Sequence, residues 1–244
     1  MPSLFEEQLK KEAEATDRLM SAGEQSFPEA LSYFPEISGR HGGLDRYLDV
    51  LRRANESTDI PIIGSLNGTT GDGWVGYATG LEQAGASAIE LNIYYIPADL
   101  AETGRDVEER YLEVVRAVKA AVSIPVAVKL GPCFSAIGQM AREIVLAGAD
   151  GLVLFNRFYQ PDIDIEELQT IPTLRLSDAG GLNIRLRWLA ILHGRTELEL
   201  AHSGCVHQSD DVIKSLMAGA TVVRVVAAIL KSGAGKLAEL VNGM

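Results

Sequence analysis

From Pro61 onward, short apolar runs alternate with longer segments of helical periodicity. The runs are rich in Val, Ile and Leu without polar alternation, which is typical of strands covered on both faces. Strands are expected at Pro61–Leu66, Ala88–Tyr95, Pro125–Leu130, Gly151–Phe158, Leu198–Ala201 and Thr221–Ala228. The intervening periodicity predicts helices at Trp74–Ala84, Asp106–Ala121, Ala136–Ala147, Leu182–Leu192 and Asp210–Ala218. This alternation predicts parallel strands joined by right-handed crossovers.

A weak internal repeat supports that arrangement. An Ala-Gly-Ala triplet closes a helix just before an apolar run at 84–86, 147–149 and 218–220. Glycine in that position supplies the left-handed conformation that ends many helices. Ile-Pro pairs at 60–61 and 124–125 open two strands, where proline costs no ladder donor. The repeated unit favours an α/β fold of the (β/α)8 TIM-barrel type, as one domain over residues 1–244.

The strand count is lower than such a barrel requires. About six strand-like runs are visible, whereas a closed barrel has eight. The chain opens on a helical pattern, Glu6–Met20, and the residues before it give no strand signal.

Composition limits the kind of partner. The formal net charge of −11 and the absence of a basic stripe argue against nucleic acid or an anionic membrane. No apolar run approaches the length of about 20 residues that spans a bilayer. Two cysteines give neither a disulfide framework nor paired metal spacing, which suits a reducing cytoplasm. The expected partner is a small molecule, no metal site is expected, and a homodimer is the candidate assembly.

Polar residues recur where the strands end. Asn67, Asn92 and Asn156 each follow an apolar run, and Lys129 lies within Val-Ala-Val-Lys-Leu. Active sites of (β/α) barrels are built at these strand ends. A single asparagine there is commonly a turn residue. A lysine in a buried strand is rarely tolerated without an anionic partner or a functional cavity, so the four together predict a polar ligand site.

The segment Ala201–Asp211 predicts a phosphate cradle. A strand ends in Ser203-Gly204, a short loop follows, and Ser209 or Asp210 is expected to cap the next helix. Successive backbone N–H groups in such a loop bind anions. A simple strand-to-helix turn is the alternative.

Four of these motifs resemble, in order and spacing, the FMN-contacting strand ends of dihydroorotate dehydrogenases. They are Ile89–Asn92, Pro125–Pro132, Leu154–Arg157 and Ser203–Val206. Two further phrases, Pro2–Gln8 and Phe158–Ile163, look like the bacterial dihydroorotate dehydrogenase-like branch. The resemblance implies an FMN-linked barrel that oxidises a CH–CH bond, dihydroorotate to orotate or a related cyclic substrate, in pyrimidine biosynthesis.

The resemblance also implies roles for individual residues. Lys129 would stabilise the reduced flavin, and Asn92 and Asn156 would line the substrate and flavin face. Ser203 and Gly204 would hold the FMN phosphate, with Cys205 beside them. A base would take a proton while a hydride passes to the flavin. Asn67 belongs to the same expected cofactor-binding set.

The chain departs from the family pattern in several places. The stretch Asn92–Pro97 lacks the cysteine base, which leaves Tyr95 and Cys133 as candidate bases. Cys205 replaces the phosphate motif's second glycine, and Val226-Ala227 replaces a small pair after the last strand. The resemblance places Met1–Leu4 at the end of the family's second strand, so an N-terminally incomplete barrel is expected.

Two alternatives stay open. One is a barrel with a phosphate site and no flavin, acting as a lyase or isomerase. The other is a truncated or degenerate paralogue that binds flavin or phosphate without dehydrogenase activity. Fold alone does not separate them, because barrels host many chemistries.

Overall fold

The computed structural model describes residues 1–21, 43–68, 70–157, 161–171 and 176–244. It divides into two compact units, and the chain passes between them after Leu91, after Arg116 and after Pro125. Unit 1 contains Met1–Leu91 with Ala117–Pro125, and unit 2 contains Asn92–Arg116 with Val126–Met244. The expectation of one domain over residues 1–244 stays a prediction.

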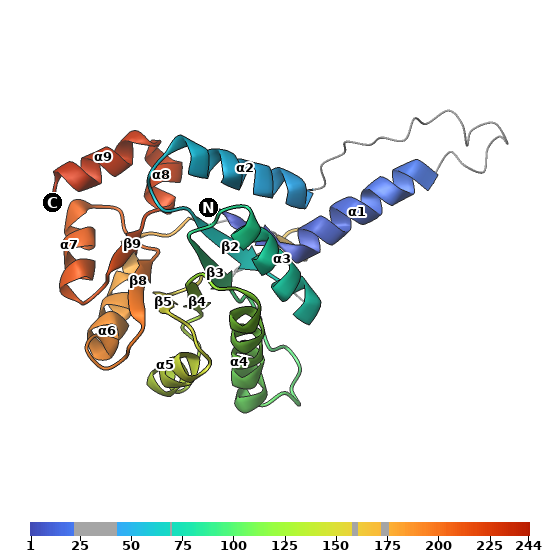
Figure 1. The fold of residues 1–244 in the computed structure, drawn as a ribbon. Helices are drawn as coiled ribbons and strands as arrows, with labels where there is room; N and C mark the ends of the chain where they lie inside the picture. Colours follow the sequence, from blue (N-terminus) through green and yellow to red (C-terminus); the bar gives the residue numbers. More distant parts are fainter. Residues whose placement is uncertain (22–42, 69, 158–160, 172–175) are drawn as a thin grey trace. The chain divides into compact units, whose positions relative to one another are not determined.

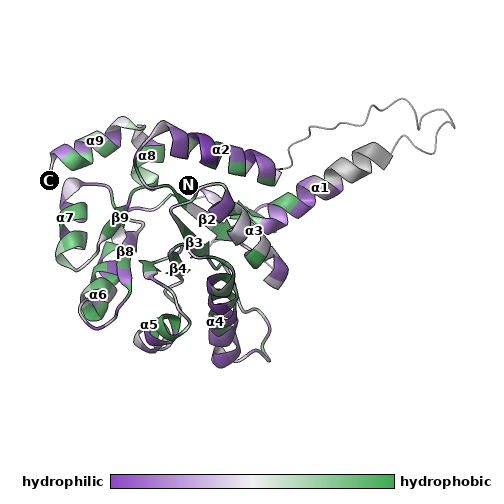
Figure 2. Ribbon diagram, viewed as in Figure 1, coloured by the Kyte–Doolittle hydropathy of each residue, from purple (hydrophilic) through white to green (hydrophobic). Residues whose placement is uncertain are grey.

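Unit 1 is built on parallel strands that lie in chain order. Strand β1 (Ser3–Phe5) pairs with β2 (Ile63–Asn67), which pairs with β3 (Ala88–Asn92). Its helices are α1 (Glu6–Ser21), α2 (Gly43–Ser57) and α3 (Gly71–Gln83). Figure 2 shows hydrophobic strands β2 and β3 and a largely hydrophilic α2, which buries only a narrow stripe including Leu48 and Leu51.

Strand β1 corrects the expectation that no strand precedes the first helix. Only three residues long, it has too few positions for a period-two pattern, and it forms because β2 supplies its hydrogen-bonding partner. The described residues therefore contain seven parallel strands, one more than the six expected. The resemblance, which read Met1–Leu4 as the end of a strand, located this element better than hydrophobic periodicity did.

A row of buried polar side chains crosses the strands of unit 1. Ser3 and Ser65 are paired in register, and their hydroxyl oxygens lie 2.7 Å apart. The Ser65 hydroxyl donates to Glu90 Oε1 at 3.0 Å, and Glu90 is buried. Glu6, also buried, accepts from the backbone and hydroxyl of Thr70, which caps α3. These carboxylates are satisfied by hydrogen bonds, as burial requires.

Unit 2 contains the rest of the strand–helix series. Parallel strands β4 (Val126–Leu130), β5 (Gly151–Leu154), β8 (Glu199–Ser203) and β9 (Val222–Arg224) lie in chain order. Helices α4 (Gly104–Ala121), α5 (Ile137–Leu146), α6 (Leu182–Leu192) and α7 (Ser209–Met217) accompany them. The five predicted inter-strand helices are confirmed to within about three residues at each end, the usual uncertainty of helix boundaries. Figure 1 shows α6 and α7 beside β8 and β9.

The register divides the side chains of unit 2 between two faces. Lys129 pairs with Val153, and Val153 pairs with Ala201, so these three side chains share one face. Leu130 pairs with Leu154, and Leu154 pairs with His202, on the other face. His202 contacts Ser215 of α7, so this second face is the one that the helices cover. Lys129 therefore lies on the face that is turned away from the helices.

The Ala-Gly-Ala turns form as predicted. Gly85, Gly148 and Gly219 have φ of 93°, 94° and 102°, in the left-handed region that side chains disfavour. Each follows a helix directly and leads into a strand.

Three local expectations were wrong. The last strand ends at Arg224, and α8 (Ala227–Ser232) takes over the predicted run, followed by α9 (Gly235–Asn242). An antiparallel hairpin, β6 (Asp162–Asp164) with β7 (Gln169–Ile171), stands where no strand was predicted. The N-cap residue of α7 is Gln208, not Ser209 or Asp210, and Asp211 completes a capping box by accepting from the Gln208 backbone N–H. Phe158, the predicted end of one run, lies outside the described residues.

In the part of the chain that the structure describes, no helix is long and apolar enough to cross a bilayer.

Candidate functional site

Two asparagines at strand ends are hydrogen-bonded to each other in unit 2. Asn92 ends β3 and Asn156 follows β5, and both side chains are buried. Asn156 Nδ2 donates to Asn92 Oδ1 at 2.5 Å, and Asn156 Oδ1 accepts from the backbone N–H of Arg157 at 3.0 Å. The Asn156 N–H donates to the Leu130 carbonyl at 2.6 Å. The structure therefore brings together two of the predicted site residues in a fixed orientation.

Lys129 stands one residue before the end of β4. Its side chain is half-buried, less enclosed than the sequence pattern suggested. It shares its face with Val153 and Ala201, away from the helices. A lysine at this position places a positive charge near the carboxyl ends of the strands.

The loop after β8 turns sharply, and the backbone N–H groups of His207 and Gln208 are already bonded to Asp211. Gly204 and Cys205 have φ of 89° and 64°, so the chain turns sharply directly after Ser203. The Cys205 N–H donates to Ser177 Oγ at 3.3 Å, and Lys231 Nζ donates to the Ser177 carbonyl at 2.9 Å. The thiol of Cys205 is buried and lies against Gly181, where a Cβ would approach it to 2.8 Å. A side chain at position 205 is thus accommodated on the Gly181 side of the loop.

Arg185 is the residue of this site that sequence reasoning missed. It is only 8% exposed, on the same stripe of α6 as the buried Leu182 and Leu189. Its Nε donates to the Ser203 carbonyl at 2.6 Å, and its Nη1 donates to the Gly181 carbonyl at 2.7 Å. A charged residue on an apolar helical stripe was the signal that would have revealed it.

The guanidinium of Arg185 is directed at the loop. A Cβ on Gly204 would lie 3.3 Å from Arg185 Nη2, a nitrogen that makes no hydrogen bond within the described residues. Burial lowers the pKa of Arg185, and the nearby Cys205 opposes that shift. An arginine remains protonated at neutral pH despite such a shift, so the loop faces a buried positive charge.

His202 stabilises the same loop through a contact with the Gly204 carbonyl. It is completely buried, its Nε2 lies 2.8 Å from the Gly204 carbonyl, and its Nδ1 lies 2.7 Å from Ser215 Oγ. A neutral ring that donates from Nε2 to Gly204 shares the one hydroxyl proton of Ser215 with the Asp211 carbonyl, which lies 2.5 Å from Ser215 Oγ. Burial, together with the charge of Arg185, lowers the pKa of His202 below 6.5, against the effects of the Gly204 hydrogen bond and of Asp211. The neutral ring therefore holds the glycine carbonyl in place at neutral pH.

Tyr95 and Cys133, the candidate bases, line one cavity of about 460 Å³ in unit 2. The Tyr95 hydroxyl donates to Glu102 Oε2 at 2.6 Å, and Arg110 lies 4.0 Å from the centre of the Tyr95 ring. The hydrogen bond to Glu102 raises the pKa of Tyr95 above 10, with burial adding to the shift. Cys133 is exposed. The raised pKa makes Tyr95 a poorer base than an ordinary phenol.

Asn67, the remaining predicted site residue, belongs to unit 1. It ends β2, is buried, and pairs in register with Phe5. Its place relative to the residues of unit 2 stays a prediction.

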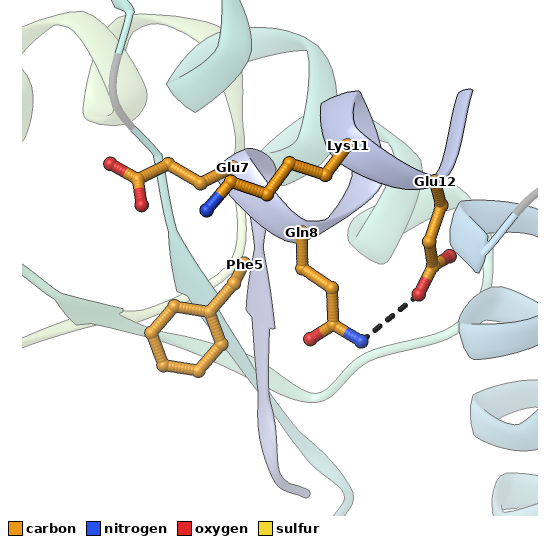
Figure 3. A pocket seen from close by; sticks show the side chains of 5 residues that line it. All are labelled: Phe5, Glu7, Gln8, Lys11 and Glu12. Carbon is orange, nitrogen blue, oxygen red and sulfur yellow. Dashed lines mark hydrogen bonds between the residues drawn. The ribbon is translucent and has the colours of Figure 1, made fainter. Parts of the chain in front are cut away.

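Unit 1 has an open hollow of about 470 Å³ beside the start of α1. Figure 3 shows the side chains that line it, from β1 and the first turns of α1: Phe5, Glu7, Gln8, Lys11 and Glu12. Gln8 Nε2 donates to Glu12 Oε1 at 3.0 Å. The lining is mostly exposed charge of both signs, which is the ordinary surface of an amphipathic helix.

Comparisons with known proteins agree on one family. A family model described as dihydroorotate dehydrogenase matches residues 39–244. The chain is 31% identical over 200 residues to an Aeropyrum pernix protein named for dihydroorotate dehydrogenase A (fumarate), covering 80% of this chain and 65% of that protein. It is 31% identical over 174 residues to a dihydroorotate dehydrogenase B (NAD(+)) catalytic subunit of Shouchella clausii, covering 68% and 57%. A protein of the same name from Methanocaldococcus jannaschii is 30% identical over 191 residues, covering 75% and 62%. The chain thus spans 57–65% of the length of these three relatives.

Proposed function

This chain belongs to the dihydroorotate dehydrogenase family, and on that premise we propose that it is an FMN-dependent oxidoreductase acting on a CH–CH bond. The proposed substrate is dihydroorotate or a related small cyclic compound. The parallel strand–helix series is of the (β/α)-barrel type that the family uses.

The loop after β8 carries the proposal, because it fits the phosphate of FMN. Gly204 leaves open the space in front of Arg185 Nη2 that a Cβ would fill. A buried guanidinium with one nitrogen unused by the protein is suited to a phosphate oxygen. His202 holds the Gly204 carbonyl, and so fixes the loop before any ligand arrives.

Other residues of unit 2 would hold the rest of the cofactor. Lys129 supplies a cation on the sheet face that the helices leave uncovered, and Asn92 with Asn156 supplies amide groups already fixed by their mutual hydrogen bond. When bound, FMN supplies the redox chemistry by accepting a hydride from the substrate. The protein's part is to orient the reacting groups and to hold charge near them.

A base must also take a proton from the substrate, and Tyr95 and Cys133 are our candidates. Both line the same cavity, so a compound bound there is within reach of either. The Tyr95 proton is held by Glu102, so Cys133 is the first of the two to test.

The physiological setting is part of the proposal. Both cysteines are unpaired, which supports a reducing cytoplasm. We also propose a place in pyrimidine biosynthesis, which the resemblance to dihydroorotate dehydrogenases implies, and a homodimer as the assembly.

The test is spectroscopic. The purified protein is expected to bind FMN, to release it on denaturation, and to show bleaching of the flavin band when substrate is added without oxygen. Lys129→Ala should slow that bleaching, because the reduced flavin loses a stabilising cation. Loss of bleaching in Lys129→Met together with full bleaching in Lys129→Arg would support a role of charge. A protein that stays colourless and leaves flavin fluorescence unchanged would favour a non-flavin barrel.

A further inference from the structure

The cavity beside Tyr95 and Cys133 has a definite chemical character. It is framed by the loop after β3, the first half of α4 and the loop after β4. Its apolar walls come from Ile96, Pro97, Val107 and Phe134. The Phe134 ring meets Tyr111 edge-on, with ring centres 5.2 Å apart, which braces one wall. A flat ring is the shape that such walls enclose well.

Apart from the hydroxyl of Ser135 and the thiol of Cys133, the polar side chains that line this cavity offer hydrogen-bond acceptors. The hydroxyl proton of Tyr95 is given to Glu102, and that of Tyr111 is given to the Ile93 carbonyl at 3.1 Å. Both phenols stay protonated, since the Glu102 hydrogen bond raises the pKa of Tyr95 and burial raises the pKa of Tyr111 to about 12. Each hydroxyl oxygen therefore has only acceptor capacity left for a ligand.

The charge of the lining points the same way. Among the described residues, Glu108 is the single charged residue that lines the cavity. Arg110, on the same helix as Glu108, is ion-paired with Glu102 at 3.1 Å, and the Glu102 side chain is 9% exposed. A ligand carboxylate would thus meet a carboxylate and acceptor oxygens, with no cation in the lining to receive it.

From these contacts we propose that the cavity binds an uncharged, flat ring compound that offers N–H donors and carries no carboxylate. This rests on the proposed function, since it narrows the substrate to uncharged dihydropyrimidine-like rings and disfavours dihydroorotate itself. The N–H groups of such a ring would donate to Tyr95 and Glu108, while its faces pack against Ile96 and Phe134.

The experiment uses two probes that differ by one carboxylate, uracil and orotate, titrated calorimetrically into the full chain. Uracil is expected to bind at least roughly tenfold more tightly than orotate, as one like charge at short range implies. Glu108→Gln should reduce the ratio of the affinity for uracil to the affinity for orotate. Glu113→Gln is the matched control, because Glu113 is exposed on the same helix and does not line the cavity.

Each outcome decides the inference. Orotate binding as tightly as uracil would overturn it, as would a preference unchanged by Glu108→Gln or the binding of neither compound. Calorimetry measures the binding of uracil and orotate, and flavin absorbance measures the FMN content of the same samples. Failure of FMN binding would therefore count against the proposed function, and failure of uracil binding against this inference.

Discussion

Acid should destabilise this protein through one buried side chain, His202. The ring is completely buried, and burial holds its pKa below the ordinary value of 6.5. The unfolded chain therefore binds a proton near pH 6.5 that the folded chain resists. The contribution of His202 to stability is complete above pH 6.5, and it declines as the pH falls towards the lower pKa of the folded state.

The size of the effect follows from a single proton. Where the folded ring stays neutral, the free energy of unfolding falls by about 1.4 kcal/mol between roughly pH 7.5 and pH 5.5. Asp211 favours the protonated ring and so offsets part of this loss of stability, whereas Arg185 disfavours the protonated ring and adds to the loss. Ser215 can turn from donor to acceptor if the ring gains a proton, because its hydroxyl also lies 2.5 Å from the Asp211 carbonyl.

Chemical denaturation at the two pH values measures this loss. His202→Gln keeps a donor for the Gly204 carbonyl and removes the titration, so its acid loss should be smaller than that of the wild type, by about 1.4 kcal/mol at most. His193→Gln is the control, because His193 is exposed. Equal pH dependence in the wild type and His202→Gln would refute the reasoning.

Two further predictions concern stability. Tyr111→Phe should lower the free energy of unfolding by about 1 kcal/mol, because it removes the hydrogen bond to the Ile93 carbonyl. The pKa of Tyr111 in the folded protein is about 12, so the wild type should lose stability above pH 10 and the variant should lose less. Denaturation at neutral and alkaline pH measures both effects. Gly219→Ala should lower the free energy of unfolding by more than about 1 kcal/mol, since φ is 102°. Gly138→Ala, in α5 with no atom within 4 Å of the new methyl, should be neutral or stabilising in the same denaturation measurement, and equal losses for the two would contradict the argument.

Much of the fold was predictable because its strands are long apolar runs separated by strongly periodic helices. The Ala-Gly-Ala turns were predictable for the same reason, since the left-handed conformation has a strong local preference for glycine. Strand β1 was not, because three residues carry too little periodicity. Helix α2 was predictable from its pattern, since Leu44, Leu48 and Leu51 recur at helical spacing, but it lies before the alternation that begins at Pro61.

The candidate site was also predictable only in part. Asn92 and Asn156 were found because they follow apolar runs, and the structure joins them by a hydrogen bond. The apolar stripe of α6 marked Arg185 as a buried charge, whereas its contact with the Ser203 carbonyl depends on α6 packing beside the end of β8, which no local pattern encodes. Glu102 was missed because it lies in a loop and meets Tyr95 only through the path of the chain.

The central claim is that the loop after β8 holds the phosphate of FMN, and fluorescence titration with FMN and riboflavin tests it most directly. Riboflavin lacks the phosphate, so the wild type should bind FMN more tightly by roughly tenfold or more, as a charge-assisted contact implies. Arg185→Met should remove most of that preference, whereas Arg187→Met, exposed on the same helix, should keep it. Equal affinity of the wild type for FMN and riboflavin, or an unchanged preference in Arg185→Met, would contradict the claim.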